Sequence, residues 1–563
     1  MGKAARRKKE TARARAAEPL AKEAKEAKET RQVKPLPRWL NLLGVPLAVV
    51  LLALFLVLKC YALHPQRVDE GIYFYEAMRL AEGARLYKEL FFAHPPFQLF
   101  LPALLTRLFG YYFLVQKALP QLAGAAQGAL AFVIARRALK SDLAGIVAMV
   151  ALLFAEDFLK ATSYATGINM ADALLFGALA VALYRRPLTA GLLAGAATMT
   201  LLQTAPTAFV LGASIFLYDR RSGKRFAIGC GAMILLAHII GIAYGGGDFF
   251  AEVYFYHLHK TVSEGAGEQV LGFLFADDLA LFCGGTLAFA LAFTSLDNRL
   301  ETRRFVRALA IAAALQTVAM ATRPKVFPFY FQPVFLPLAL ALGWAVSVAL
   351  SRLRAAASGQ ARAVAMSLAL SVLVLPILLT APLTALVSPT RARQRETYTQ
   401  SYRWKDAPGL GSLNPVVRWL LWSGGERAAG SWHNPATEYL WNLSRDFDSY
   451  PAIVEAVKRA SPEGGTLFGD SGSVPLVALG AGRRVTADFA DTNVQRFASG
   501  TTPPSVAIAK LEAVGGPTLI LNSNNAGLFS LPEFRVYLEE HYAPLQQFAD
   551  GNGTRYTLYR RAR

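Results

Sequence analysis

The chain has 563 residues, of which 54% are hydrophobic and 17% charged, and its mean hydropathy is +0.32. This composition is too apolar for one soluble domain, and repeated apolar runs near bilayer length predict a polytopic α-helical membrane protein. The formal net charge of +20 does not indicate a nucleic-acid partner, because residues 1–38 alone hold 13 Lys/Arg against 5 Asp/Glu and much of the remaining excess lies in short loops between apolar runs.

Three domains are predicted along the chain. Residues 1–38 form a basic cytoplasmic tail rich in Ala, Lys, Glu and Arg. Residues 39–387 form a transmembrane domain, whose first helix is the apolar run Trp39–Leu58 with its basic flank inside. Residues 388–563 contain no apolar run of bilayer length, and we expect a soluble α/β domain on the extracytoplasmic side.

The segment His64–Phe97 follows the first helix directly and therefore emerges at the membrane surface. It begins with two adjacent carboxylates, Asp69 and Glu70, and continues as a predicted amphipathic helix, Gly71–Ala81. Paired acids beside a bilayer are costly to desolvate and mark a site, whereas acids in a first helical turn also stabilise the helix N-terminus. Both interpretations stay open for the two carboxylates considered alone.

The topology follows from the basic clusters, which belong on the cytoplasmic side. They all lie inside if the segment Phe97–Phe109 does not cross the membrane but forms an interfacial or re-entrant helix. About eleven crossings result, with the N-terminus inside and the C-terminus outside. The ten helices predicted after the first external segment are Tyr112–Ala135, Leu143–Phe154, Ala171–Tyr184, Leu188–Gln203, Ala205–Tyr218, Phe226–Tyr244, Leu271–Phe293, Phe305–Ala321, Pro328–Leu350 and Ala363–Val387.

This topology places further charged loops outside. The second external loop carries Glu156, Asp157 and Asn169. A later loop carries Arg323 and Lys325, against the usual bias of cations towards the cytoplasm. Such cations can snorkel to lipid phosphates, but two cations bounded by prolines are placed more rigidly than snorkelling needs. We therefore interpret this pair as phosphate-binding.

From Tyr450 onward, helical and strand patterns alternate, which is typical of a small α/β layer structure. The predicted helices are Ala452–Ala460, Val474–Leu479, Pro504–Val514 and Pro532–His541, and the predicted strands are Thr466–Gly469, Arg484–Ala487, Thr518–Leu521 and Arg555–Tyr559. The sequence GDSGS, residues 469–473, falls at a strand-to-helix turn, where open α/β sheets place ligands. It matches neither a phosphate-binding glycine loop nor a nucleophile elbow, so it is a weak signal.

The external segments also carry a family resemblance. An N-terminal helix, then D-E-x-x-Y, G-x-x-x-Y and a Pro-Pro start to the next segment, resembles the GT-C glycosyltransferases, in particular the protein O-mannosyltransferases and the lipid A aminoarabinose transferases. The second external acid pair and a late R-P-K-x-F-P-x-Y sequence are similar to that group as well. The residues concerned are Asp69, Glu70, Tyr73, Gly83 and Tyr87 in the first segment, and Arg323, Lys325 and Tyr330 in the late one.

The resemblance implies that the enzyme takes a sugar from a polyprenyl-phosphate carrier, which is a membrane lipid, and transfers it to a glycan, lipid or protein acceptor on the outer face. It also implies that the reaction is an inverting displacement. Asp69 occupies the family position of the general base, and Glu70 is its neighbour in the motif. Fixed cations suit the departing lipid phosphate, so the donor-phosphate candidates are Arg323, Lys325 and Tyr330. The weaker substrate-binding candidates are Tyr73, His94 and Asn169.

A metal is left open. Glu70, Glu156 and Asp157 would orient the acceptor or hold a divalent cation, and Asp69 with Asp157 is a candidate metal pair. Hard oxygen ligands suit Mg²⁺ or Mn²⁺, but some members of the family use no catalytic metal. No cofactor is predicted with certainty.

Two other function classes stay open. A secondary transporter or lipid flippase would show internal repeats and ionisable residues at the midplane of broken helices. A non-catalytic membrane scaffold would leave the external acids and the pair Arg323 and Lys325 unexplained. No clear internal repeat is visible and the acids cluster in external loops, so the sequence favours a multi-pass enzyme of the plasma membrane.

Overall fold

The computed structural model describes residues 38–60, 63, 65–67, 69–260, 278–294, 297, 299–323, 328–355, 359–360, 363–364, 366–367, 447–500, 502–524, 527–550 and 553–562. Residues 1–37, nearly all of the predicted helix Ala363–Val387 and residues 388–446 lie outside the described part. Two predicted site residues are affected: Lys325 is not described, and neither is the side chain of Glu156.

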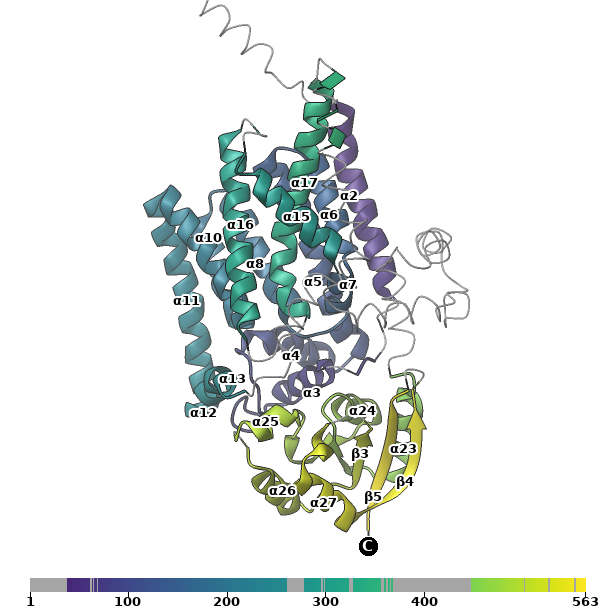
Figure 1. Ribbon diagram of the computed structural model, residues 1–563. Helices are drawn as coiled ribbons and strands as arrows, with labels where there is room; N and C mark the ends of the chain where they lie inside the picture. Colours follow the sequence, from purple (N-terminus) through teal and green to yellow (C-terminus); the bar gives the residue numbers. More distant parts are fainter. Residues whose placement is uncertain are drawn as a thin grey trace, which may run out of the picture.

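The described part before residue 356 is helical and forms an upright bundle in Figure 1. Its main helices are α2 (Arg38–Lys59), α3 (Glu70–Ala81), α4 (Phe97–Phe109), α5 (Phe113–Ile134), α6 (Asp142–Leu153), α7 (Glu156–Ala161), α8 (Ile168–Leu183), α9 (Pro187–Thr200), α10 (Ala205–Tyr218), α11 (Arg220–Gly245), α12 (Gly247–Phe250), α13 (Tyr256–Leu258), α15 (Leu279–Leu291), α16 (Leu300–Ala321) and α17 (Gln332–Ala355). Short 3₁₀ and π turns connect several of them, including η3 (Leu202–Thr204), η4 (Ala251–Phe255) and η6 (Pro328–Phe331).

Four of the described helices are long and apolar enough to cross a membrane, namely Phe113–Leu139, Arg220–Gly245, Leu300–Ala321 and Gln332–Arg354. Shorter apolar helices pack beside them, among them α2, α6 and α8. The chain is thus a polytopic helical membrane protein, and the number of eleven crossings stays a prediction.

Helix α17 lies within the bundle and packs against α6, α15 and α16. Its close approach to α6 requires Gly343, because a Cβ there would lie 2.2 Å from the carbonyl oxygen of Ala144. The adjacent Trp344 is buried and donates from Nε1 to Asp297 Oδ2 at 3.0 Å, which satisfies its polar atom. This packing fixes the middle of α17, and the helix itself follows directly on η6, which carries Tyr330.

The predicted helix boundaries agree closely with the observed ones in two places. Helix α4 spans the predicted Phe97–Phe109, and Figure 1 shows it with α3 at the end of the bundle that faces the C-terminal domain. Helices α9 and α10 are separate and joined through η3, as predicted from the short apolar runs on either side. The interfacial placement of α4 stays a prediction.

The C-terminal domain is built on a five-stranded sheet of order β2-β1-β3-β5-β4. Its strands are β1 (Thr466–Gly469), β2 (Arg484–Val485), β3 (Leu519–Ser523), β4 (Tyr542–Ala549) and β5 (Arg555–Arg561), and its helices are α23 (Tyr450–Ala460), α24 (Val474–Ala481), α25 (Val494–Ala498), α26 (Pro504–Ala513) and α27 (Pro532–His541). Strand β1 pairs in parallel with β2 and β3, and β5 pairs antiparallel with β3 and β4.

The structure differs from the predicted strands in two respects. Strand β4 was not predicted, and the predicted strand Arg484–Ala487 ends at Val485. The early end has a backbone cause, because Ala487 and Asp488 adopt left-handed φ angles of 51° and 54° that a strand does not accommodate.

Helix α3 joins the two parts of the molecule. Its residues Ile72, Phe74 and Tyr75 belong to the same hydrophobic core as α23 and α24. Contact with α24 is close at Gly71, where a Cβ would lie 2.7 Å from the side chain of Leu476. The helix that begins at the predicted site is therefore part of the core of the C-terminal domain.

Candidate active site

The start of α3 separates the two adjacent acids. Asp69 precedes the first helical turn, is exposed, and lines a cavity. Glu70 is fully buried, and its two carboxylate oxygens accept hydrogen bonds from Lys117 Nζ at 2.7 and 2.6 Å. The same ammonium donates to Gln66 Oε1 at 2.7 Å. Asp69 is thus placed to meet a ligand, while Glu70 ties the start of α3 to α5.

The cavity beside Asp69 has a volume of about 650 Å³, within the usual size of a small-molecule site. It lies where α3, the segment before α4, the α13 region, the connection between α16 and α17, and the C-terminal domain meet. Five of the residues predicted from the sequence line it together: Asp69, Tyr73, His94, Arg323 and Tyr330.

Tyr73 and His94 form a pair on the cavity wall. The hydroxyl of Tyr73 lies 3.1 Å from His94 Nε2, and Tyr87 holds the same loop by donating from its hydroxyl to the carbonyl of His94 at 2.9 Å. Burial raises the pKa of Tyr73 well above its usual range, and the nearby carboxylates of Asp69 and Asp491 raise it further. Tyr73 therefore keeps its proton and acts as a hydrogen-bonding group.

A second group on the wall is cationic. The guanidinium carbon of Arg323 lies 5.8 Å from the centroid of the Tyr330 ring, and Lys260 lines the same cavity. Burial, together with the charges of His257, Lys260 and Arg323, lowers the pKa of His94, so this imidazole is neutral at pH 7. Fixed positive charge in a partly dry cavity suits a phosphate group.

Two predicted site residues, Asp157 and Asn169, do not line this cavity and are instead bonded within the protein. Asp157 is buried, and its backbone N–H donates to Asp278 Oδ2 at 2.9 Å. Asn169 is also buried; its Nδ2 donates to the carbonyl of Ala161 at 2.8 Å, and its Oδ1 accepts from Gln332 at 2.7 Å. These bonds fix the polar loop between α6 and α8, and any contact of these residues with a substrate stays a prediction.

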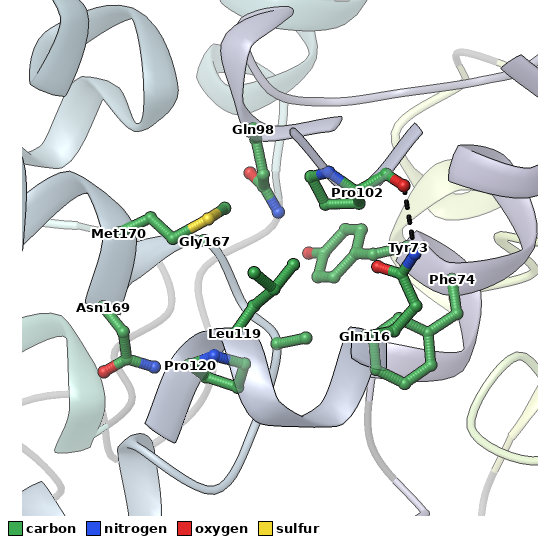
Figure 2. A pocket seen from close by; sticks show the side chains of 11 residues that line it. Tyr73, Phe74, Gln98, Pro102, Gln116, Leu119, Pro120, Gly167, Asn169 and Met170 are labelled. Carbon is green, nitrogen blue, oxygen red and sulfur yellow. Dashed lines mark hydrogen bonds between the residues drawn. The ribbon is translucent and has the colours of Figure 1, made fainter. Parts of the chain in front are cut away.

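A small chamber of about 20 Å³ lies on the other side of Tyr73. Figure 2 shows the Tyr73 ring projecting into it, with Gln98 pointing towards the same space and Gln116 donating to the carbonyl of Pro102 at 3.0 Å. Gln98 is buried, and neither atom of its amide has a hydrogen-bond partner within the protein. The size and polarity of the chamber suit one water molecule, and Tyr73 forms the boundary between this chamber and the large cavity.

The described residues contain no group of three or more His, Cys, Asp or Glu side chains arranged to hold a metal ion. The two carboxylates considered as a metal pair, Asp69 and Asp157, do not line the same cavity, because Asp69 lines it and Asp157 does not. The described residues therefore do not fit a Mg²⁺ or Mn²⁺ site.

The cavity also contains residues that the sequence did not indicate. His257 and Lys260 come from the aromatic stretch after α11, and His257 donates from Nε2 to the carbonyl of Ala93 at 2.7 Å. The C-terminal domain contributes a further set, Asp491, Asn493 and Gln495, which no motif connected with the first external segment.

The comparison with known proteins concerns nearly the whole chain. No protein-family model matches the sequence, and no curated protein matches it. The structure is similar to that of ArnT from Cupriavidus metallidurans bound to undecaprenyl phosphate, with 17% identity and a TM-score of 0.56 over 92% of this chain and 97% of that one. It is also similar to ArnT of the same organism in the apo state, with 16% identity and a TM-score of 0.59 over 91% and 97%. The chain therefore has the fold of these ArnT structures, in agreement with the resemblance of its external motifs to the lipid A aminoarabinose transferases.

Proposed function

We propose that this protein is a membrane glycosyltransferase that moves a sugar from a polyprenyl-phosphate donor to an acceptor on the extracytoplasmic face. The single observation that carries the proposal is that Asp69 and Arg323 line the same cavity. The similar ArnT structure contains undecaprenyl phosphate, which supports a lipid-linked donor.

The proposed reaction is an inverting displacement. Asp69 accepts the proton of the acceptor hydroxyl, whose oxygen forms a bond to the anomeric carbon of the donor sugar as the bond from that carbon to the phosphate oxygen breaks. The electron pair of the broken bond leaves with the polyprenyl phosphate. A general base within hydrogen-bond reach contributes about 10²–10⁴-fold to such a step.

The cations stabilise the leaving group. Arg323 can present a bidentate pair of donors to the phosphate, and Lys260 adds a point charge on the same cavity wall. Lys325 is assigned to the same group by its position in the motif. Tyr330 contacts Arg323 through its ring and thereby limits the positions of the guanidinium.

Tyr73 and His94 are proposed to orient the donor sugar. The hydroxyl of Tyr73 and the imidazole of His94 are both uncharged at the cavity. Uncharged hydrogen-bonding groups suit sugar hydroxyls, whereas a charged side chain there would compete with the phosphate site. The role proposed for Asp157 lies in supporting the neighbouring loop, where it is buried and bonded to Asp278 through its backbone N–H. We further propose that the membrane is the plasma membrane, with the N-terminus in the cytoplasm and the cavity and C-terminal domain outside.

The experiment that tests this function compares Asp69→Asn with Glu89→Gln in membranes that contain the full-length protein. Glu89 is an exposed acid on the same external segment that does not line the cavity, so its variant is a matched control. Transfer of isotope-labelled sugar from undecaprenyl-phosphate-linked donors is followed by product mass. We expect Asp69→Asn to lose about 10²–10⁴-fold in turnover and to keep its affinity for undecaprenyl phosphate. Normal turnover in this variant would contradict the assignment of the base.

A further inference from the structure

We propose that the C-terminal domain supplies the acceptor half of the cavity through the loop Asp491–Gln495, and that this half recognises the hydroxyl groups of a neutral glycan. The inference rests on the proposed glycosyl transfer and adds the class of acceptor to it. The lining side chains from the C-terminal domain are one carboxylate and two amides, Asp491, Asn493 and Gln495, whereas the described lining Lys and Arg residues belong to the N-terminal part.

The loop lies at the edge of the sheet where open α/β folds bind ligands. Thr492 donates from Oγ1 to the carbonyl of Gly469, the last residue of β1, at 2.7 Å. Strand β1 is parallel to both of its neighbours, so this is the carboxyl edge of the parallel strands. Inside the loop, Asp491 Oδ1 accepts from the N–H of Asn493 at 2.9 Å and Asn493 Oδ1 accepts from the N–H of Gln495 at 3.0 Å. The backbone that carries the three side chains is therefore fixed.

The GDSGS sequence lies close to the same place. A Cβ added at Gly472 would lie 3.4 Å from the Cγ atom of Arg67, which lines the cavity. Asp470, in the same turn, accepts a hydrogen bond from Ser523 Oγ at 2.9 Å, which ties the turn to β3. The weak ligand signal in the sequence thus marks the sheet edge that faces the cavity.

Arg496 holds the loop against the N-terminal part. It is buried and donates to the carbonyl of Asp491 at 2.8 Å, while its guanidinium carbon lies 4.1 Å from the ring centroid of Phe91 and 5.0 Å from that of Phe489. Arg496 therefore holds the loop against the segment that carries Phe91, and the loop forms one wall of the cavity.

The geometry of an inverting displacement assigns this wall to the acceptor. The acceptor oxygen and the departing phosphate lie on opposite sides of the reacting carbon. Arg323, the proposed phosphate ligand, follows the C-terminal end of α16 in the bundle, whereas the loop Asp491–Gln495 belongs to the other domain. Asp69 begins α3, the helix shared by both. Amide and carboxylate groups hydrogen-bond to hydroxyls, and Asp491 would repel an acceptor that presents phosphate there.

The test uses the full-length protein in host membranes, with their glycolipids as acceptors and labelled undecaprenyl-phosphate-linked sugar as donor. The first variant combines Asn493→Ser with Gln495→Ala, because Ser keeps an oxygen that can cap α25. The matched control combines Gln546→Ala with Gln547→Ala, which removes two exposed amides from β4 of the same domain. Thermal melting checks folding, and binding of undecaprenyl phosphate alone checks the donor site.

We expect the loop variant to lose transfer to glycan by about tenfold to a hundredfold, and to bind undecaprenyl phosphate within twofold of the unmodified protein. The control should match the unmodified protein in both measurements. Equal transfer by the two double variants overturns the inference. So does a loop variant that loses affinity for undecaprenyl phosphate, because the wall would then belong to the donor. If the unmodified protein and the control both transfer nothing, the proposed function itself fails, and this outcome is distinct from the other two.

Discussion

Replacing Glu70 with Gln is expected to destabilise the protein far more than replacing Asp69 with Asn. The two residues are adjacent and the changes are chemically equivalent, since each turns a carboxylate into an amide of the same shape. Their surroundings differ. Glu70 and Lys117 have fully buried side chains with Nζ–O distances of 2.6 and 2.7 Å, whereas Asp69 is exposed at the cavity.

The magnitude follows from the burial of the pair. Removing one partner leaves the other charge buried without compensation, which costs about 3–5 kcal/mol. At about 2–4 °C per kcal/mol, the relation for domains of 150–250 residues, the melting temperature of Glu70→Gln should fall by several degrees or more. Asp69→Asn loses no buried charge, so its melting temperature should stay within about a degree or two of the unmodified protein, as for other surface changes.

The assay is thermal melting of both purified variants in one detergent, together with the double variant Glu70→Leu, Lys117→Met. Exchanging a buried ion pair for apolar side chains of similar size is often neutral, so this double variant should recover much of the lost stability. A Glu70→Gln variant as stable as Asp69→Asn would refute the argument. It would mean that the buried charge of Lys117 costs no stability when the carboxylate of Glu70 is removed.

Three further predictions concern the junction, a buried acid and the phosphate site. Asp488→Asn should lower the melting temperature and expose the C-terminal domain to limited proteolysis, because the carboxylate accepts charged hydrogen bonds from Arg79 at 2.9 and 3.0 Å, worth about 1.5–3 kcal/mol each. Burial raises the pKa of Glu252 to about 8, so the folded state binds an extra proton and stability falls as the pH rises towards that value. Glu252→Gln should therefore melt higher than the unmodified protein at pH 8 and flatten the dependence of melting temperature on pH; an unchanged slope would contradict this. Arg323→Ala should reduce the use of donor in steady-state kinetics by about ten- to a hundredfold and the use of acceptor much less, and unchanged donor kinetics would remove Arg323 from the phosphate site.

The sequence predicted those elements whose limits are marked by local chemistry. Helix α4 begins after a Pro-Pro pair and ends before Gly110, and its bounds are those predicted. Strand β4 has the opposite character: most of its residues are exposed, so it lacks the apolar alternation by which strands are predicted. Its place in the sheet depends on pairing with β5, which is a long-range property of the fold.

The candidate site was predicted in part for the same reason. Asp69, Tyr73 and His94 lie within one external segment, so a motif could connect them. The contact between Tyr75 and Asp488 joins residues 413 positions apart, and no local pattern indicates it. Asn169 shows a different difficulty, because a polar residue in an external loop carries the same sequence signal whether it binds a substrate or, as here, satisfies backbone groups.

Glu70 attaches α3 to the bundle and thereby affects the position of the proposed base, Asp69. One face of α3 lies in the core of the C-terminal domain, and the acceptor wall belongs to that domain. Arg323 and Tyr330 belong to the bundle, so the distance between the proposed base and the proposed phosphate ligands depends on how firmly α3 is attached to the bundle. The ion pair between Glu70 and Lys117 is a buried link of this kind, one residue from Asp69. A misplacement of 1 Å can cost about 10²-fold in rate, so loosening this link should reduce turnover at temperatures where the protein is still folded.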